Sequence, residues 1–203
     1  MLESIQGNIE NSDNFQMKTS LYIPETAKWY GLLNQAQAET KHYLATDLER
    51  YMANMLFRFA TDGKGLLEQS HSTAVFELNS VREQRLMRLQ GAGERCLVTA
   101  GFFPEHANFA GLSLLHFIDT GRSAYRDLAE AMPDSSVYQQ INNSFVELVD
   151  ILQKVGELSG VCRSIDLIQA CELWQQERSQ YGWFMIGAKT NSFPASTACT
   201  TTH

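Results

Sequence analysis

Acidic residues and histidines recur at close spacing in this sequence, and such combinations can support acid–base or metal chemistry. Glu39 and His42 are three residues apart, as are Glu68 and His71. Di-iron carboxylate bundles use two glutamate–histidine pairs of this spacing together with two further glutamates, because residues i and i+3 of a helix project together. The four residues are therefore weak candidates for metal ligands, and a metal-dependent oxidase of the di-iron carboxylate type is one alternative function.

The expected helix faces argue against this metal site. In the helix expected over about residues 39–60, leucine, methionine and aromatic side chains share one face, and Glu39 and His42 point away from it. Glu68 and His71 fall in a segment without helical periodicity. We therefore predict no metal site and no cofactor.

The stretch 101–130 combines histidines, acids and arginines with an apolar background. On a helical wheel His116 and Asp119 fall on the polar face, so we expect them to face solvent rather than to form a reactive pair. Glu105 and His106 are another possible acid–base pair, but no third group accompanies them, and we expect both in a surface loop.

Arginines form the one concentrated basic feature of this acidic chain. Arg85, Arg88 and Arg95 lie on one flank of the helix expected over about residues 80–100. Guanidinium groups bind phosphate and carboxylate well, so this flank could hold a small anionic ligand. The other interpretation is that the arginines pair with acids of their own helix, such as Glu94, or of adjacent helices.

A pocket for a small anionic ligand would combine this arginine flank with the G-F-F segment behind it and with the following helix. A helical-bundle protein that binds such a ligand, and that could be an enzyme, is the first alternative function. The candidate ligand-binding residues are Arg88, Arg95, Phe102, Phe103, Arg122 and Tyr125.

Two glycines, Gly93 and Gly121, lie within the apolar faces of two successive expected helices. Glycine inside a helix costs roughly 1 kcal/mol relative to alanine, so each position needs a reason, which is close approach of a neighbouring helix or, at Gly121, the floor of a small ligand slot. We predict that the two glycines meet at a tight helix crossing. Leucine at either position should then destabilise the protein by overpacking.

The composition fits one soluble domain with a substantial core. The chain has 203 residues, of which 44% are hydrophobic and 19% are charged. Its net charge of -7 disfavours generic nucleic-acid binding, because phosphate contacts need a basic face. No apolar run approaches the roughly 18 residues of a membrane span, and the polar N-terminus lacks a secretory pattern. We therefore expect a cytoplasmic protein without membrane insertion.

The four cysteines indicate a reducing compartment. Cys96, Cys162, Cys171 and Cys199 include no C-x-x-C pair, which excludes a zinc ribbon or a thioredoxin-type motif. Free thiols are the expected state, and Cys96 and Cys171 are expected on apolar helix faces.

Helical periodicity recurs between the four prolines, without convincing alternating strands or internal repeats. We predict an all-α fold, a single compact bundle of about five or six antiparallel helices. The helical domain is expected at residues 23–187, between a mobile N-terminal segment (1–22) and a disordered tail (188–203). The expected helices cover about residues 25–37, 39–60, 80–100, 113–132, 137–158 and 165–183.

The string RLMRLQGAGERCLVTAGFFPEH, followed by HFIDTGRSAYRDLAE, resembles a family of conserved bacterial proteins of unknown function. The resemblance covers the middle part of the chain and comprises an arginine-rich helix, G-[DE]-x-C-L, G-F-F and G-x-x-A-Y. It implies a bacterial origin and a helical domain, and it carries over no catalytic residue, cofactor or partner. The matching residues are Gly93, Glu94, Cys96, Leu97, Gly101, Phe102, Phe103, Gly121, Ala124 and Tyr125.

The helical pattern is strong, and no catalytic constellation falls on the apolar faces. The sequence has no G-x-S-x-G, P-loop, H-E-x-x-H or dinucleotide fingerprint. We therefore favour a non-enzymatic interaction or regulatory module that binds a protein partner or associates with itself. The anion-binding bundle and the di-iron oxidase remain the two alternatives.

Overall fold

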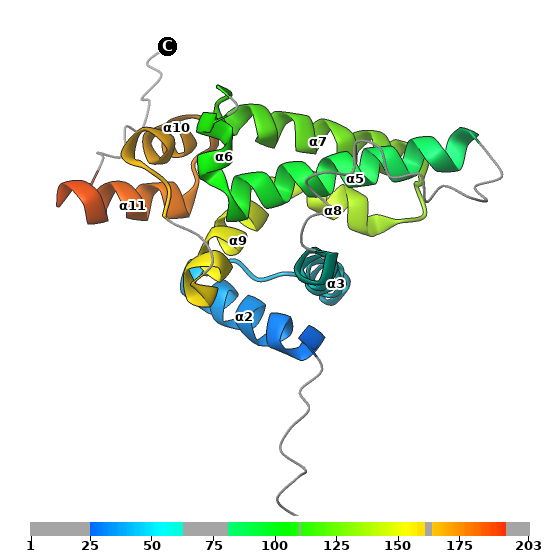
Figure 1. The fold of residues 1–203 in the computed structure, drawn as a ribbon, viewed down its shortest axis with the longest axis horizontal. Coiled ribbons are helices and arrows are strands. Elements are labelled where there is room, and N and C mark those ends of the chain that lie inside the picture. Colours follow the sequence, from blue (N-terminus) through cyan, green and yellow to red (C-terminus); the bar gives the residue numbers. More distant parts are fainter. Residues whose placement is uncertain (1–24, 63–80, 110, 161–163, 194–203) are drawn as a thin grey trace, which may run out of the picture.

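The computed structural model describes residues 25–62, 81–109, 111–160 and 164–193, which are helical apart from their connections (Figure 1). No strand occurs within these ranges, which confirms the predicted all-α class for the described part of the chain. The segment predicted to be mobile, 1–22, lies outside them. The helices are α2 (Glu25–Thr40), α3 (Thr46–Asp62), α5 (Val81–Phe102), α6 (Pro104–Phe109), α7 (Leu114–Ala131), α8 (Ser136–Asn143), α9 (Phe145–Ser159), α10 (Leu167–Glu177) and α11 (Gln180–Thr190).

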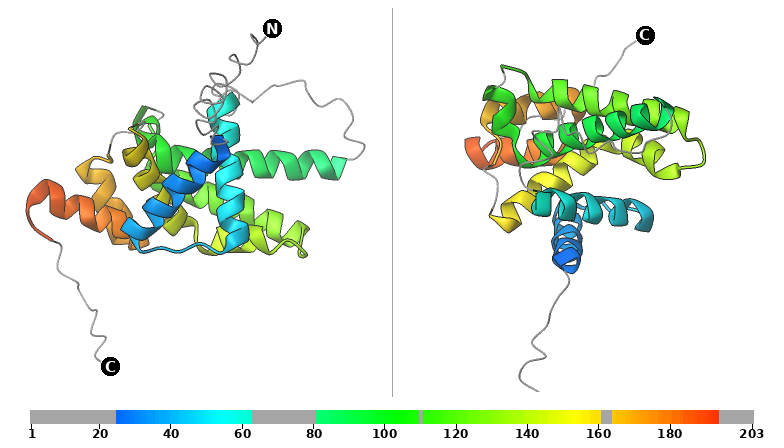
Figure 2. Two further views of the ribbon diagram at one scale, coloured as in Figure 1. Left: turned by 90° about the horizontal axis from the view of Figure 1, so that it is seen from below. Right: turned by 45° about the vertical axis from the view of Figure 1, so that its right-hand side comes forward.

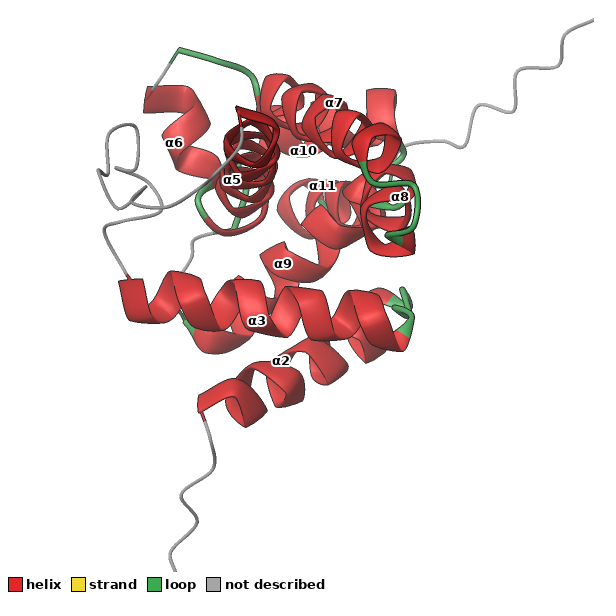
Figure 3. Ribbon diagram, turned by 90° about the vertical axis from the view of Figure 1, so that its right-hand side faces the viewer, coloured by secondary structure: helices red, strands yellow, loops and turns green. Residues whose placement is uncertain are grey.

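The α5 and α7 helices form a long antiparallel pair, which Figure 1 shows from the side and Figure 3 end on. Their direction follows from two contacts, since Arg82 lies beside Ala131 and Cys96 lies beside Gly121. The α9 helix packs on α5, and α2 packs on both α9 and α3. Figure 2 shows that α3 runs across α5 at a steep angle, so the helices do not share one axis. The α10 and α11 helices pack together at the end of the molecule that lies away from the start of α5.

The helix expected from residue 39 begins later, because α2 extends further than predicted. The α2 helix continues to Thr40, and Lys41 then adopts a left-handed conformation with φ of 59°. A residue in this conformation commonly ends a helix. The next helix, α3, starts only at Thr46. Glu39 and His42 are therefore separated by a helix end and do not project as an i, i+3 pair.

Two further expected helices are each divided in two. The first divides at Ser144, between α8 and α9. The second divides at Arg178, which has a left-handed φ of 57°, and Ser179 then caps the N-terminus of α11. The α11 helix continues to Thr190, beyond the predicted domain end at residue 187.

Pro104 begins a short helix where we expected a surface loop. Proline cannot continue α5, because it has no backbone N–H, but it suits the first turn of a helix. The α6 helix leaves Glu105 half-buried and His106 exposed. The imidazole of His106 stacks on the ring of Phe103, with 5.2 Å between ring centroids.

The apolar and polar faces of α7 lie as predicted. His116 and Asp119 are exposed, whereas Ile118, Gly121 and Tyr125 are buried. The α5–α7 pair therefore buries one face of α7 and leaves the other in solvent.

The two described cysteines, Cys96 and Cys171, are free thiols, as predicted, and Cys96 is buried. Burial raises the pKa of the Cys96 thiol, so this group is a poor nucleophile at neutral pH. Cys162 and Cys199 lie outside the described residues.

Gly93 and Gly121 allow close packing of α5 and α7, but their partners are aromatic rings. A Cβ atom on Gly93 would lie 2.7 Å from Cε2 of Tyr125. A Cβ atom on Gly121 would lie 2.7 Å from Cε2 of Phe145 and 3.0 Å from Cβ of Cys96. The prediction of close packing is thus confirmed, whereas the prediction that the two glycines meet each other is wrong.

Candidate functional site

A buried carboxylate, that of Glu94 on α5, lies where α3, α5 and α7 meet. Glu94 is 5% exposed, and its Oε1 accepts hydrogen bonds from the Tyr51 hydroxyl and from Nη2 of Arg58, both at 2.7 Å. Nε2 of Gln90 donates to the same oxygen at 2.9 Å. The hydroxyl of Tyr125 lies 3.1 Å from that of Tyr51. We call these five residues the Glu94 cluster.

The hydrogen bonds of the Glu94 cluster hold helices together and do not provide a group for proton transfer. Burial raises the pKa of both Tyr51 and Tyr125 above the ordinary value of 10.0, and the charge of Glu94 acts in the same direction. Both phenols are therefore protonated at neutral pH and act as hydrogen-bond donors. Because Arg58 balances the charge of Glu94, the groups of the cluster satisfy one another and join three helices.

An open depression of about 290 Å³ lies beside the Glu94 cluster, between α3 and the start of α8. Its rim carries Asp47 and Arg50, which are 3.4 Å apart and thus already paired with each other. The rings of Tyr51 and Tyr138 form part of its wall. The charges of Asp47 and Arg50 therefore largely cancel, so the depression attracts an ionic ligand only weakly.

A second buried carboxylate, that of Asp150 on α9, holds the N-terminus of α11. Its Oδ1 accepts a hydrogen bond from Oγ of Ser179 at 2.6 Å. Its Oδ2 accepts the backbone N–H groups of Gln180 at 2.9 Å and Tyr181 at 3.2 Å. Nε2 of His42 lies 3.7 Å from Oδ2, which is beyond hydrogen-bond length, so this contact is ionic when the imidazole is protonated.

Ser179, His42 and Asp150 thus lie close together, but their hydrogen bonds are not those of a catalytic serine–histidine–aspartate triad. A catalytic serine donates its proton to the histidine, which the aspartate orients. Ser179 instead donates directly to Asp150 and accepts the N–H of Gly182 as a helix cap. It is 1% exposed, so substrate could not reach its hydroxyl. The contacts of Ser179 and Asp150 therefore cap the N-terminus of α11.

His42 makes the stability of the fold depend on pH. The Asp150 carboxylate raises the pKa of His42 from 6.5, partial burial opposes this, and the charge of Glu147 adds to it. A group whose pKa is raised on folding stabilises the protein fully below its unfolded pKa and loses this effect as pH rises through its folded pKa. We expect His42→Gln to lower the melting temperature at about pH 5.5 and to change it little at about pH 9.

Thermal unfolding of the wild type and of His42→Gln at the two pH values measures this effect. His116→Gln is the matched control, because His116 is exposed on α7. An equal loss from His42→Gln at both pH values would contradict the ionic role of the imidazole.

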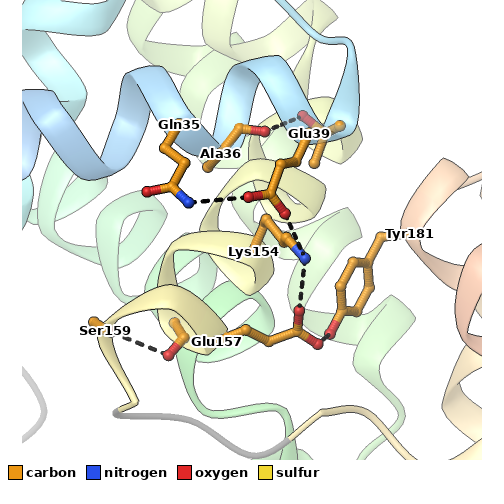
Figure 4. Close-up of polar contacts among 9 residues, drawn as sticks. Gln35, Ala36, Glu39, Lys154, Glu157, Ser159 and Tyr181 are labelled. Carbon is orange, nitrogen blue, oxygen red and sulfur yellow. Dashed lines mark hydrogen bonds and ion pairs between the residues drawn. The ribbon is translucent and has the colours of Figure 1, made fainter.

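Lys154 and Glu157 connect α9 to α2 through Glu39 and to α11 through Tyr181 (Figure 4). Nζ of Lys154 lies 2.8 Å from Oε2 of Glu39 on α2 and 3.2 Å from Oε2 of Glu157. The Tyr181 hydroxyl of α11 donates to Oε1 of Glu157. The hydrogen bond from Lys154 is the main reason why the pKa of Glu39 is lowered. Glu39 thus forms an ion pair with Lys154, which also contacts Glu157.

The weak metal candidates do not converge within the described residues. Glu39 contacts Lys154, whereas His42 contacts Asp150. No group of three histidine, cysteine, aspartate or glutamate side chains in the described ranges is placed to hold a metal ion. Glu68 and His71 lie outside those ranges. The geometry that a di-iron site needs is therefore not formed by the glutamate–histidine pair of the described residues.

The six candidate ligand-binding residues lie in different surroundings. Phe102 and Tyr125 are buried in the core, and Phe103 is half-buried. Arg122 pairs with Glu177 of α10, at 2.9 Å between Nη1 and Oε2. These four residues pack or pair within the protein, and the remaining two are the arginines of α5.

Arg88 is exposed and Arg95 is half-buried, on the same flank of α5 as the exposed Arg85. Within the described ranges, none of these three guanidinium groups has a carboxylate oxygen within 4.0 Å. Glu94, which we considered as their partner, pairs instead with Arg58 of α3. Among the described residues, the arginine flank is therefore not neutralised by a carboxylate in direct contact.

The first ten residues of α5, 81–90, lie beside the last turns of α7, at the outer end of the α5–α7 pair (Figures 1 and 2). We call this segment the outer half of α5. Val81 is 85% exposed and Met87 is 56% exposed, next to the exposed Arg85 and Arg88. Exposed basic and apolar side chains thus both occur on the outer half of α5, which is the candidate functional site of the described residues.

Searches of known protein families, of curated proteins and of solved structures found no match to this chain. In the described ranges, no helix is both long enough and apolar enough to cross a bilayer.

Sequence reasoning located the arginine flank but missed the Glu94 cluster and the role of Asp150. A signal for the cluster was present, because Tyr51 and Tyr125 lie on the apolar faces of their helices and Glu94 lies between Gly93 and Cys96. Asp150 had no comparable signal. It lies on the polar stripe of α9 together with Glu147, Lys154 and Glu157, so nothing in the sequence distinguishes it from an acid that faces solvent.

Proposed function

We propose that this protein is a non-enzymatic interaction module that binds an acidic protein surface through the outer half of α5. One observation carries this proposal. The arginines of this segment have no carboxylate partner among the described residues, although the chain has a net charge of -7. An arginine-rich surface on an acidic protein suits a partner that brings its own carboxylates.

The residue types of the outer half are those that protein interfaces favour. Arginine and methionine are enriched at interfaces, where a long side chain supplies apolar contact together with a directed donor. Met87 and Arg88 are adjacent and exposed, and Arg85 lies one turn earlier. Because these three side chains are exposed, a partner can reach them without rearrangement of the core.

The interior supports a non-enzymatic role. Among the described residues, the buried carboxylates of Glu94 and Asp150 are engaged by hydroxyl, amide and guanidinium groups of their own and neighbouring helices. A general acid or base needs a titrating group within reach of a substrate. Both carboxylates instead fix the positions of helices, which favours a scaffold that presents a surface.

Site-specific photo-cross-linking tests this proposal in the organism that makes the protein. A photoreactive amino acid in place of Met87 should give a discrete cross-linked product, which mass spectrometry identifies. The matched control places the same group at Asp119, which is exposed on α7. We expect the product from position 87 to disappear when Arg85 and Arg88 are changed to glutamate. The same product from both positions, or none from position 87, would contradict the proposal.

A small anionic ligand is the second candidate, and the unpaired guanidinium groups of Arg88 and Arg95 in the described structure favour it. Arginine forks bind phosphate and carboxylate ligands as readily as protein carboxylates. Native mass spectrometry of the freshly purified full chain separates the two candidates. A stoichiometric added mass that Arg88→Gln abolishes would support the anion, whereas an unliganded mass would favour the protein partner.

A further inference from the structure

A groove lies between the outer half of α5 and the last turns of α7, with a volume of about 460 Å³. Figure 1 shows that these two segments lie at the same end of the α5–α7 pair, and Figure 3 shows them side by side. The residues that decide its character are Arg82, Arg85, Leu86, Leu89, Asp127 and Glu130.

The two walls of the groove carry opposite charges. Arginines line the α5 wall, and Asp127 and Glu130 line the α7 wall. Arg82 is partly used within the chain, since its Nη2 donates to the carbonyl oxygen of Ala131 at 2.9 Å. Arg85 has no carboxylate within 4.0 Å among the described residues, although both acids line the same groove. Among the described residues, no ion pair therefore joins Arg85 to either acid across the groove.

The floor of the groove is apolar and incompletely covered. Leu86 and Leu89 continue the buried stripe of α5 that includes Gly93 and Leu97, but both leucines are only half-buried. Removal of these side chains from water would be favourable for any occupant that brings an apolar ridge. A suitable occupant therefore combines an apolar centre with an acidic strip on one side and a basic strip on the other.

We propose that the occupant is the same groove of a second copy of this chain, in a two-fold symmetric dimer. A two-fold axis through the groove exchanges the α5 wall of one copy with the α7 wall of the other. Arg85 of each copy then faces Asp127 and Glu130 of its partner, and the two leucine floors meet between them. The inference rests on the proposed interaction function and names its partner, because the second copy carries the required order of charges by symmetry.

Two single charge reversals and their mixture test the dimer. We expect the wild-type chain to sediment as a dimer, and Arg85→Glu or Glu130→Arg alone to raise the dimer dissociation constant by about tenfold or more, because like charges then face each other. An equimolar mixture should restore dimers. In the mixed dimer, the substituted position 85 of one copy faces the substituted position 130 of the other, so their charges are exchanged but still opposite. The second contact joins the native Arg85 of one copy to the native Glu130 of the other. A folding defect in either variant could not produce this recovery.

Matched controls make the same charge changes outside the groove. Arg126→Glu and Asp119→Arg alter exposed residues of α7, and both should dimerise as the wild type does. Arg85 and Glu130 are also exposed, so circular dichroism should show unchanged helical content in both test variants. Asp127→Arg provides a second variant of the acidic wall.

A wild-type chain that remains monomeric at about 100 μM would overturn the dimer, and so would a mixture that remains as monomeric as its components. The failure of this inference is distinct from that of the proposed function. If the wild type is monomeric and position 87 cross-links to a different protein, the dimer is wrong and the interaction function stands. If it is monomeric and position 87 gives no product, both fail.

Discussion

Leucine in place of Gly121 is expected to lower the free energy of unfolding by about 3 kcal/mol. The new side chain would begin 2.7 Å from Cε2 of Phe145 and 3.0 Å from Cβ of Cys96. Phe145 is fully buried and Cys96 almost so, which leaves the neighbours little room to move. The α5 helix would therefore have to separate from α7. Urea denaturation followed by circular dichroism measures the change.

Gly31 provides a matched control for this substitution. It lies in α2, it is exposed, and a Cβ atom built there meets no atom within 4 Å. Gly31→Leu should leave stability unchanged or raise it by about 0.5 kcal/mol, because leucine is the better helix former. Gly93→Leu should resemble Gly121→Leu, since it would displace the buried ring of Tyr125. An unchanged urea midpoint for Gly121→Leu would contradict the close packing of α5 and α7.

Replacing Glu94 by alanine is expected to lower the free energy of unfolding by about 2–3 kcal/mol. Three donors would lose their shared acceptor, namely the groups of Tyr51, Arg58 and Gln90. The Arg58 side chain is 46% exposed and can turn toward water, which keeps the loss below that of a fully buried ion pair. Glu94→Gln should cost less, because the amide oxygen can still accept a hydrogen bond.

A double-mutant cycle isolates the contact that matters most in this cluster. Glu94→Ala combined with Tyr51→Phe should show a coupling energy of about 1–2 kcal/mol, because the two residues share a short hydrogen bond. Asp119→Ala is the control, since Asp119 is exposed, and it should change stability by less than about 0.5 kcal/mol. Additive effects of the two cluster mutations would show that the hydrogen bond does not stabilise the fold.

The amino-acid pattern was sufficient for the fold class and for the faces of the long helices. Helical periodicity depends on neighbours three and four positions apart, so it can be read without knowledge of the remaining chain. This is why the buried face of α7 and the exposure of His116 and Asp119 were predictable. The need for close packing at Gly93 and Gly121 followed from the same local reasoning, because glycine within an apolar helix face has few other uses.

The positions of the helix breaks at Lys41, Ser144 and Arg178 were not predictable in this way, although a break near residue 38 was expected. Lys41 and Arg178 adopt left-handed conformations that glycine would normally mark, and the sequence has no glycine or proline at any of the three positions. The start of α11 also depends on Asp150, which is distant in the chain and accepts the first backbone N–H groups of that helix. A break that long-range contacts stabilise leaves no local signal.

The same limit applies to the charged residues of the site. The arginine flank of α5 was visible in the sequence, because its spacing places the guanidinium groups along one side of a helix. Which carboxylate each arginine meets was not visible, since a partner is chosen by distance in space. Glu94 lies on the same helix as those arginines, yet the packing of α3 against α5 brings Arg58 to it instead. Periodicity thus identified the faces of the helices, and the packing of those helices determined which arginines pair with a carboxylate of the described residues.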